Sequence, residues 1–170
     1  MKPGDHPEFF RLPPPPGRSR ESTIVLDRQG RFWHDGELVT HTGMARAFAS
    51  WIDVHPDDGR FILQNGYDWS YFEVEDVPYF VTGIAVRDGG VTLSLSDGSE
   101  ELLAPESLSV GDSDAVYLRV KNGRFEARLT PAAQTALAPI LHAGEDGEPE
   151  LWVAGRRHRI GPRRQVSSTH

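Results

Sequence analysis

The pattern of apolar and polar residues predicts strands through the middle of the chain. Apolar residues alternate with polar ones over 67–71 and again over 91–95, which is the period of a strand with one buried face. Glycine-containing turns over 88–90 and 97–99 separate these runs and are typical of hairpins. Further along, Asn122-Gly123 joins two apolar runs. This pair predicts a type I′ turn, because both central residues of such a turn need a positive φ.

Two segments carry the spacing of amphipathic helices instead. Thr42 is the expected N-cap of the first, and Thr130, followed by Pro131 in the first turn, is the expected N-cap of the second. Pro139 should kink or end the second helix. The apolar positions are Met44, Phe48, Trp51 and Ile52 in the first helix, and Ala133, Leu137, Ile140 and Leu141 in the second.

The order of the predicted elements repeats within the chain. In each half a hairpin precedes a helix, an acidic glycine turn and then a strand. We therefore predict an α+β fold of two similar lobes, with mostly antiparallel sheets, one helix per lobe and an internal repeat. The expected organisation is a proline-rich arm (1–22), an N-terminal lobe (23–73), a β-rich C-terminal lobe with one helix (74–161) and a basic flexible tail (162–170).

Charge is distributed unevenly along the 170 residues. The net charge is −7, yet residues 155–170 contain five arginines and no acidic residue. An acidic body disfavours nucleic-acid binding over most of the surface. We expect the basic tail to fold back on this body; contact with an acidic partner or with nucleic acid is the alternative.

Composition also bounds the cellular setting. The chain contains no cysteine, so it has no disulfides, thiol chemistry or cysteine-based zinc site. No apolar run approaches the about 18 residues of a membrane span. The first residues lack the apolar stretch of a secretory signal. We therefore expect a cytoplasmic protein without a membrane partner.

Three segments resemble conserved stretches of the bacterial domain-of-unknown-function family 1285 (DUF1285). They are GRFWHDGELV (30–39), VEDVPYFV (74–81) and YLRVKNGRFEAR (117–128). The resemblance implies two lobes, each with a curved, mostly antiparallel sheet packed on one helix. It implies no established activity, although a role in signal transduction has been suggested for the family. Two positions depart from the family pattern: Leu95-Ser96 replaces a Thr-Asn pair, and Glu106-Ser107 replaces His-Pro.

The familiar motifs of catalysis are missing from the sequence. It contains no HExxH helix, no G-x-S-x-G elbow and no phosphate-binding glycine loop. We therefore expect no metal, no cofactor and no catalytic residues, and we favour a non-enzymatic binding or signalling module. The alternative is an enzyme that uses histidine and carboxylate residues in a cleft between the lobes. The candidate ligand-binding residues are Trp33, His34, His41, Trp69 and Asp76.

The aromatic run over residues 67–72 is the main reason to expect binding. Tyr67, Trp69 and Tyr71 should share one face of a strand, and Phe72 should point the other way. We expect one face to meet the first predicted helix. The other face needs a cover, either the second lobe or another chain, because monomers seldom leave large apolar patches exposed. The partners expected are therefore a second copy, a protein or a small molecule.

Overall fold

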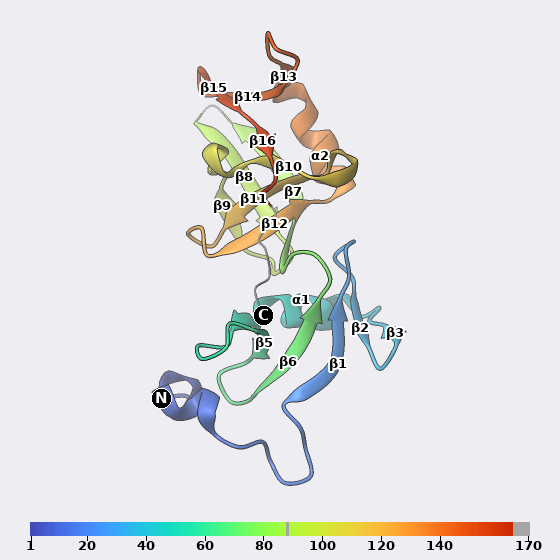
Figure 1. The fold of residues 1–170 in the computed structure, drawn as a ribbon, viewed down its shortest axis with the longest axis vertical. Coiled ribbons are helices and arrows are strands. Elements are labelled where there is room, and N and C mark those ends of the chain that lie inside the picture. Colours follow the sequence, from blue (N-terminus) through green and yellow to red (C-terminus); the bar gives the residue numbers. More distant parts are fainter. Residues whose placement is uncertain (88, 165–170) are drawn as a thin grey trace. The chain divides into compact units, whose positions relative to one another are not determined.

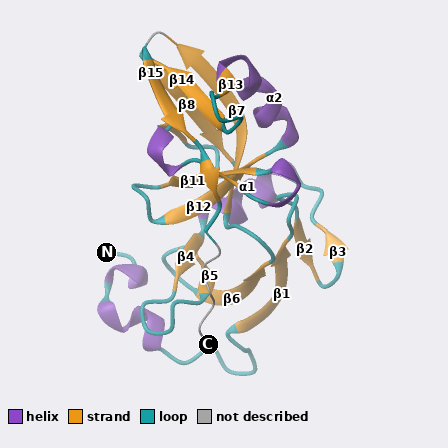
Figure 2. Cartoon of the chain, turned by 45° about the horizontal axis from the view of Figure 1, so that its top comes forward, coloured by secondary structure: helices purple, strands orange, loops and turns teal. Residues whose placement is uncertain are grey.

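The computed structural model describes residues 1–87 and 89–164. The fold is α+β, with sheets predominating and two short α-helices (Figures 1 and 2). The chain divides into two compact units, Met1–Pro78 and Tyr79–His170. The sequence predicts this division after residue 73, five residues earlier. No helix among the described residues is long and apolar enough to cross a bilayer.

The N-terminal unit is built on one mixed sheet of six strands. The strands lie in the order β3-β2-β1-β6-β5-β4; β1 and β6 are parallel, and all other neighbours are antiparallel. The unit comprises the 3-10 helices η1 (Pro3–Asp5) and η2 (Pro7–Arg11), the strands β1 (Glu21–Leu26), β2 (Phe32–His34), β3 (Glu37–Leu38), β4 (Ile52–Val54), β5 (Phe61–Gln64) and β6 (Trp69–Val74), and the helix α1 (Thr42–Ser50).

Helix α1 begins and ends differently from the prediction. His41, not Thr42, is the N-cap, because its Nδ1 accepts a hydrogen bond of 3.1 Å from the backbone N–H of Met44. An imidazole nitrogen thus replaces the hydroxyl that more often serves as a cap. At the other end Trp51 is the C-cap and Ile52 already belongs to β4, so the helical spacing runs two residues beyond the helix.

The two faces of β6 are covered by different elements. Phe72 faces the side of Phe32 and Phe61, with ring centroids 6.5 and 6.4 Å away, and Phe32 in turn contacts Phe48 of α1 at 5.5 Å. The predicted contact between this strand and the first helix therefore runs through Phe32. Tyr67 is not on the strand, which begins at Trp69, and Tyr67 is exposed.

The opposite face of β6 is covered by the N-terminal arm of the same chain. The sequence predicts a cover for this face from a second lobe or another chain, and it does not point to the arm. Phe9 of η2 is 3% exposed and packs with Ile62 and Trp69, while Phe10 and Tyr71 border the cluster. The arm is thus partly an extension of the core, and only residues beyond η2 have the open, proline-rich character that the sequence suggests.

The C-terminal unit contains a seven-stranded and a three-stranded sheet. The larger has the order β16-β10-β11-β12-β7-β8-β9, with β12 parallel to β7 and β10 parallel to β16; the smaller is the meander β13-β14-β15. The strands are β7 (Tyr79–Arg87), β8 (Gly90–Leu95), β9 (Glu100–Leu102), β10 (Ser109–Val110), β11 (Val116–Val120), β12 (Phe125–Leu129), β13 (Leu141–Ala143), β14 (Pro149–Val153), β15 (Arg156–Arg159) and β16 (Gly161–Pro162). The helices are α2 (Pro131–Leu137) and the 3-10 helices η3 (Pro105–Ser107), η4 (Asp112–Asp114) and η5 (Ala138–Ile140).

Several local predictions for this unit are confirmed. Asn122 and Gly123 have φ of 58° and 78°, and the N–H of Arg124 donates to the carbonyl of Lys121, as a type I′ turn requires. Strand β8 alternates buried and half-buried residues. Strands β7 and β8 form the expected hairpin, although Asp88 of the predicted turn lies outside the described residues.

The second helix also follows the sequence up to its proline. Thr130 caps α2 by accepting from the N–H of Ala133 at 3.3 Å, and Pro131 occupies the first turn. The helix gives way to η5 at Ala138, next to Pro139, as the missing N–H of a proline predicts. Leu141 is therefore a strand residue of β13 rather than a helical one.

Each unit contains a hairpin, a helix and a three-stranded meander in that order. The meander β4-β5-β6 joins the sheet of its hairpin in the N-terminal unit, whereas β13-β14-β15 forms a sheet of its own in the C-terminal unit. The two units are therefore alike in element order but differ in sheet connectivity. The internal repeat stays a prediction.

Candidate functional site

The most distinctive surface of the N-terminal unit is an aromatic groove filled by the arm. Ile62 and Tyr71 are paired across β5 and β6, and Trp69 follows the same face of β6. The His55 ring, in the turn after β4, lies 4.9 Å from Trp69 and 5.7 Å from Tyr71. We call the surface formed by His55, Ile62, Trp69 and Tyr71 the arm groove.

Two aromatic rings of the arm occupy this groove. Phe9 packs against Ile62 and Trp69 and is almost fully buried. Phe10 lies edge-on to Phe9 at 5.0 Å and to His55 at 5.8 Å. Rings at such distances and angles gain edge-to-face attraction in addition to the burial of apolar area.

The groove also binds the backbone of the arm. The indole Nε1 of Trp69 donates to the carbonyl of Phe9 at 3.2 Å. His55 Nδ1 accepts from the N–H of Asp57 at 3.1 Å, so the ring proton lies on Nε2, which donates to the carbonyl of Phe10 at 3.1 Å. Two successive carbonyls are thus recognised by two side-chain donors, in addition to the rings.

Ion pairs surround the groove. Arg11, next to Phe10, donates to both carboxylate oxygens of Asp57 at 3.0 and 3.2 Å, which lowers the pKa of Asp57 and raises the pKa of Arg11. Arg60 makes the same two-fold contact with Glu21 at 2.8 and 3.0 Å, and the pKa of Glu21 is lowered. Because both pairs are exposed to solvent, each contributes little to the free energy of unfolding. Their main effect is to align the two segments that each pair joins.

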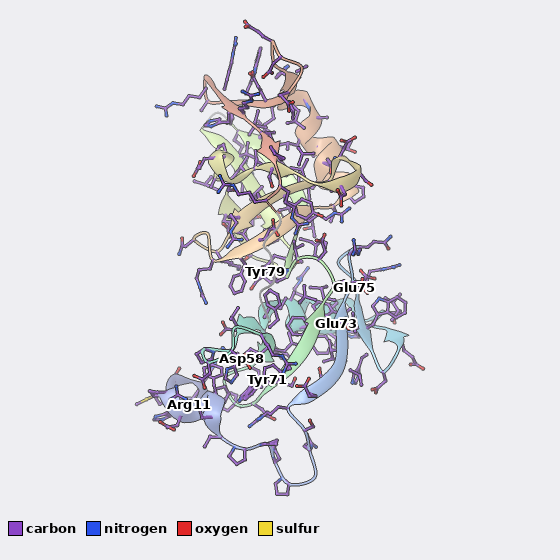
Figure 3. The ribbon with its side chains drawn as sticks, in the orientation of Figure 1. Arg11, Asp58, Tyr71, Glu73, Glu75 and Tyr79 are labelled. Carbon is purple, nitrogen blue, oxygen red and sulfur yellow. The ribbon has the colours of Figure 1, made fainter. Side chains whose placement is uncertain are left out.

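Tyr71 and Asp58 link the rings to this charged rim. The Tyr71 hydroxyl donates to Asp58 at 2.7 Å, and the Arg60 guanidinium stacks on the Tyr71 ring at 3.7 Å. Burial and this hydrogen bond raise the pKa of Tyr71. Burial of Asp58 opposes its ionisation, but the hydrogen bonds from Tyr71 and the backbone of Arg60 outweigh that effect and lower its pKa. Figure 3 labels Arg11, Asp58 and Tyr71 at this rim.

Arg20 fastens the far end of the arm. Its guanidinium lies over the Trp69 ring at 4.5 Å and donates to the Trp69 carbonyl at 2.8 Å. It also donates to the carbonyls of Leu12 and Pro13, each at 3.1 Å. At the near end the N–H of Gly4 donates to the carbonyl of Gly66 at 2.7 Å. The arm is therefore bound along its length by side-chain and backbone donors.

Only one of the predicted ligand-binding residues, Trp69, belongs to the arm groove. Trp33 instead donates its indole N–H to Asp27 at 2.8 Å and braces the β1–β2 hairpin. His34 is exposed, with Nε2 3.6 Å from Asp35, and His41 caps α1. Asp76 is half-buried in the loop after β6.

Neither His34, His41 nor Asp76 lines the cavity of about 180 Å³ beside α1 or the cavities of about 310 and 410 Å³ in the C-terminal unit. Across residues 1–87 and 89–164, no three histidine, aspartate or glutamate side chains gather in a way that could hold a metal ion. The residues that sequence reasoning missed are Phe9, Phe10, Arg20, His55, Asp58 and Arg60; the signal was the Phe-Phe pair that precedes the proline run.

Each unit also contains cavities, the first of which shares Trp69 with the arm groove. One of about 180 Å³ opens beside α1, between Phe48, Trp51 and Leu63. One of about 310 Å³ lies in the C-terminal unit, with Val91, Leu103 and Pro105 among its apolar lining. A third, of about 410 Å³, lies between β9, η3 and the β11–β12 turn, with Glu101 and Asn122 among its lining. None of them holds a segment of the chain as the arm groove does.

The C-terminal unit contains a second compact polar cluster at Lys121. Its Nζ contacts Asp97 at 2.6 Å and Ser99 at 2.9 Å, and its backbone N–H donates to Glu101. Burial opposes ionisation of Asp97, yet the hydrogen bonds from Lys121 and Ser99 lower its pKa. Lys121 has a positive φ of 56°, which these contacts stabilise. The cluster anchors the type I′ turn.

The start of the predicted basic tail is held by the body. Arg163 donates to both oxygens of Glu126 at 2.7 and 3.0 Å and stacks on Tyr117 at 3.8 Å. Pro162 is part of β16. Residues 165–170, the rest of this tail, lie outside the described residues.

Comparison with known proteins gives a fold but no activity. No protein-family model and no curated protein matches the chain. Two solved structures are similar to it. A DUF1285 family protein from Silicibacter pomeroyi DSS-3 has 20% sequence identity and a TM-score of 0.65, with 92% of this chain and 86% of that chain covered. A DUF1285 family protein from Shewanella baltica OS155 has 18% identity and a TM-score of 0.56, with 71% and 94% covered. The chain therefore has a DUF1285-type fold.

Proposed function

We propose that the N-terminal unit is a non-enzymatic binding module that recognises a short aromatic peptide segment in the arm groove. In this structure the chain's own residues 7–11 occupy the groove as an internal ligand. The observation that carries the proposal is the burial of Phe9 together with the recognition of the Phe9 and Phe10 carbonyls by Trp69 and His55.

The contacts are of the kind that recognise peptides. Phe9 supplies an apolar anchor, two carbonyls accept from groove side chains, and Arg11 pairs with Asp57. Aromatic anchors combined with backbone hydrogen bonds give peptide recognition both affinity and specificity. A competing segment would therefore need two adjacent aromatic residues followed by a basic residue.

The connection of the arm to the sheet favours a ligand that can leave. Leu12 and Pro13 are exposed, and most of the residues up to Ser19 are exposed as well. A segment joined by exposed residues with few buried contacts opens at a lower free energy than the sheet it covers. Displacement of the arm by a partner segment would then be the signal in a signalling role.

Binding in trans tests the proposal. The protein is the full chain with Phe9→Ala and Phe10→Ala, which frees the groove, and the ligand is a labelled synthetic peptide of residues 1–20. We expect this variant to bind the peptide, and we expect the natural chain, whose groove is filled, to bind it at least about tenfold more weakly. A peptide with both phenylalanines replaced by alanine is the matched control and should not bind.

The result that would overturn the proposal is a folded double variant that ignores the natural peptide. Circular dichroism and a cooperative melting transition establish that the variant is folded. Binding of the control peptide with equal affinity would also contradict the proposal, because it would remove the aromatic rings from the recognition.

We also infer that the two units arose from a repeated hairpin, helix and meander. The shared element order supports this inference. We further propose a cytoplasmic location, which the lack of cysteine supports.

A further inference from the structure

We infer that the arm exchanges between two copies of this chain, so that Phe9 and Phe10 of each copy fill the arm groove of the other. The inference rests on the proposed function of the groove and names its partner. The product is a closed, two-fold dimer in which both grooves are occupied. The hinge between the arm and β1 makes this exchange possible.

The hinge has two parts, a stiff run and a single reversal. Pro13–Pro16 has no N–H groups to pair and prefers an extended polyproline conformation of about 3.1 Å per residue. The reversal is a turn in which the N–H of Arg18 donates to the carbonyl of Pro15 at 3.0 Å and Gly17 has a φ of 77°. Proline followed by a glycine of positive φ is typical of a type II turn. Figure 1 shows the chain leaving η2, passing through this open loop and turning back into β1.

The return of the arm to its own groove therefore depends on the conformation of Gly17. If the turn opens, the proline run extends and carries the arm away from its own sheet. Every contact between arm and groove can then form with a second copy, because the contacts do not depend on which chain supplies the arm. The closed monomer and the exchanged dimer differ mainly in the hinge and in the entropy of association.

Arg20 favours exchange over simple release. It holds the carbonyls of Leu12 and Pro13, which lie on the arm side of the turn, while Arg20 itself lies next to β1. Its Nε is buried without a hydrogen-bond partner among the described residues, and its side chain is only 15% exposed. An empty groove would leave the donors of Arg20, Trp69 and His55 without these acceptors, so a second arm is favoured over solvent.

Gly17 offers a sharp test because its surroundings are empty. A Cβ at this position would meet no atom within 4 Å, so a substitution acts only through the backbone. Gly17→Val disfavours the positive φ, because a β-branched residue is strained in the left-handed region. Gly17→Asn is the matched control, because asparagine tolerates this region.

Sedimentation velocity of the full chain measures the outcome. We expect Gly17→Val to lower the dimer dissociation constant by about tenfold per hinge, and hence about a hundredfold for two hinges. Gly17→Asn should stay close to the natural chain. A Gly17→Val chain that remains an 18.9 kDa monomer at every concentration at which the natural chain is monomeric would overturn the inference.

The same dimer must depend on the groove. Adding Phe9→Ala and Phe10→Ala to Gly17→Val should return the chain to monomer, and a dimer that persists would overturn exchange through the arm. If the peptide of residues 1–20 binds to the Phe9→Ala/Phe10→Ala chain while the Gly17→Val chain is monomeric, arm exchange is contradicted and the proposed function stands. If the peptide does not bind, the proposed function is contradicted, and the inference of arm exchange is contradicted with it.

The natural hinge can be tested directly because the chain has no cysteine. Arg11→Cys and Asp57→Cys are made in separate chains, mixed, and treated with a short bismaleimide cross-linker. We expect a covalent pair that joins the two variants and that is lost when the Arg11→Cys chain also carries Phe9→Ala and Phe10→Ala. Absence of the pair, or its survival after those substitutions, would contradict exchange in the natural chain.

Discussion

The indole N–H of Trp69 donates to the carbonyl of Phe9 at 3.2 Å, across 60 positions of the sequence. This bond joins the first strand residue of β6 to an arm that precedes the sheet. It is accompanied by the burial of the Phe9 ring against Ile62 and by the donation from His55 to the Phe10 carbonyl. The N-terminal segment is therefore bound as a ligand is bound, by an anchor and by backbone recognition.

Phe9→Ala should destabilise the N-terminal unit markedly. Removal of a fully buried phenylalanine ring costs about 2–3 kcal/mol of unfolding free energy. The loss cannot exceed the free energy that holds the arm on the sheet, because beyond that value the arm detaches. Leu12→Ala is the control in the same arm; Leu12 is 52% exposed, so the loss should be under about 0.5 kcal/mol. Urea denaturation measures both, and equal losses would contradict the assigned role of Phe9.

Gly123→Val should destabilise the C-terminal unit. Gly123 has a φ of 78° and open space around its Cβ position, so the cost, about 1–2 kcal/mol, comes from the backbone alone. Gly123→Asn should cost much less. The melting temperature of each variant measures this loss of stability, and an unchanged value for Gly123→Val would contradict the type I′ assignment.

Acid should loosen the arm rim before it unfolds the sheets. The pKa values of Asp57, Asp58 and Glu21 are lowered in the folded chain by their partners. Their contribution is therefore complete above the unfolded pKa of about 4 and is lost as the pH falls through the lower folded values. The protection factors of the arm amides, which are hydrogen-exchange rates corrected for the intrinsic rate at each pH, should fall in this range, and Asp57→Asn should weaken that pH dependence. Protection factors of the arm amides that do not change with acid would contradict the prediction.

Lys121 and Asp97 should be energetically coupled. Lys121→Met leaves the Asp97 carboxylate, whose side chain is 9% exposed, without its cation, at a cost of about 2 kcal/mol. Asp97→Asn together with Lys121→Met should cost about 1 kcal/mol less than the sum of the two single changes. A double-mutant cycle measured by chemical denaturation checks this, and strict additivity would show that the contact contributes nothing.

Features set by neighbouring residues could be predicted from the sequence. The Asn122-Gly123 turn, the Thr130 cap and the end of α2 beside Pro139 each depend on a few adjacent residues. The N-cap of α1 could not, because Thr42 satisfies the usual preference and only the geometry shows that His41 accepts the bond. The α+β class followed from the periodicity of the strands.

The arm groove escaped prediction because it depends on contacts between distant segments. The proline run indicates a linker, and that interpretation extended too far toward the N-terminus, over the Phe9-Phe10 pair. The need for a cover on the second face of β6 was predicted correctly, but nothing in the periodicity says which segment provides it. His55 likewise reads as a turn residue until the fold places it against Trp69.

Binding of an aromatic segment as a ligand in the arm groove can be tested at the Trp69 indole itself. The Nε1–H resonances of the chain's four tryptophans, Trp33, Trp51, Trp69 and Trp152, are recorded in the natural chain and in the Phe9→Ala/Phe10→Ala chain. We expect the double substitution to shift the Trp69 resonance most. Adding the peptide of residues 1–20 should return it to its natural position and leave Trp152 unmoved. A Trp69 resonance that the peptide does not move, in a chain that remains folded, would contradict the claim.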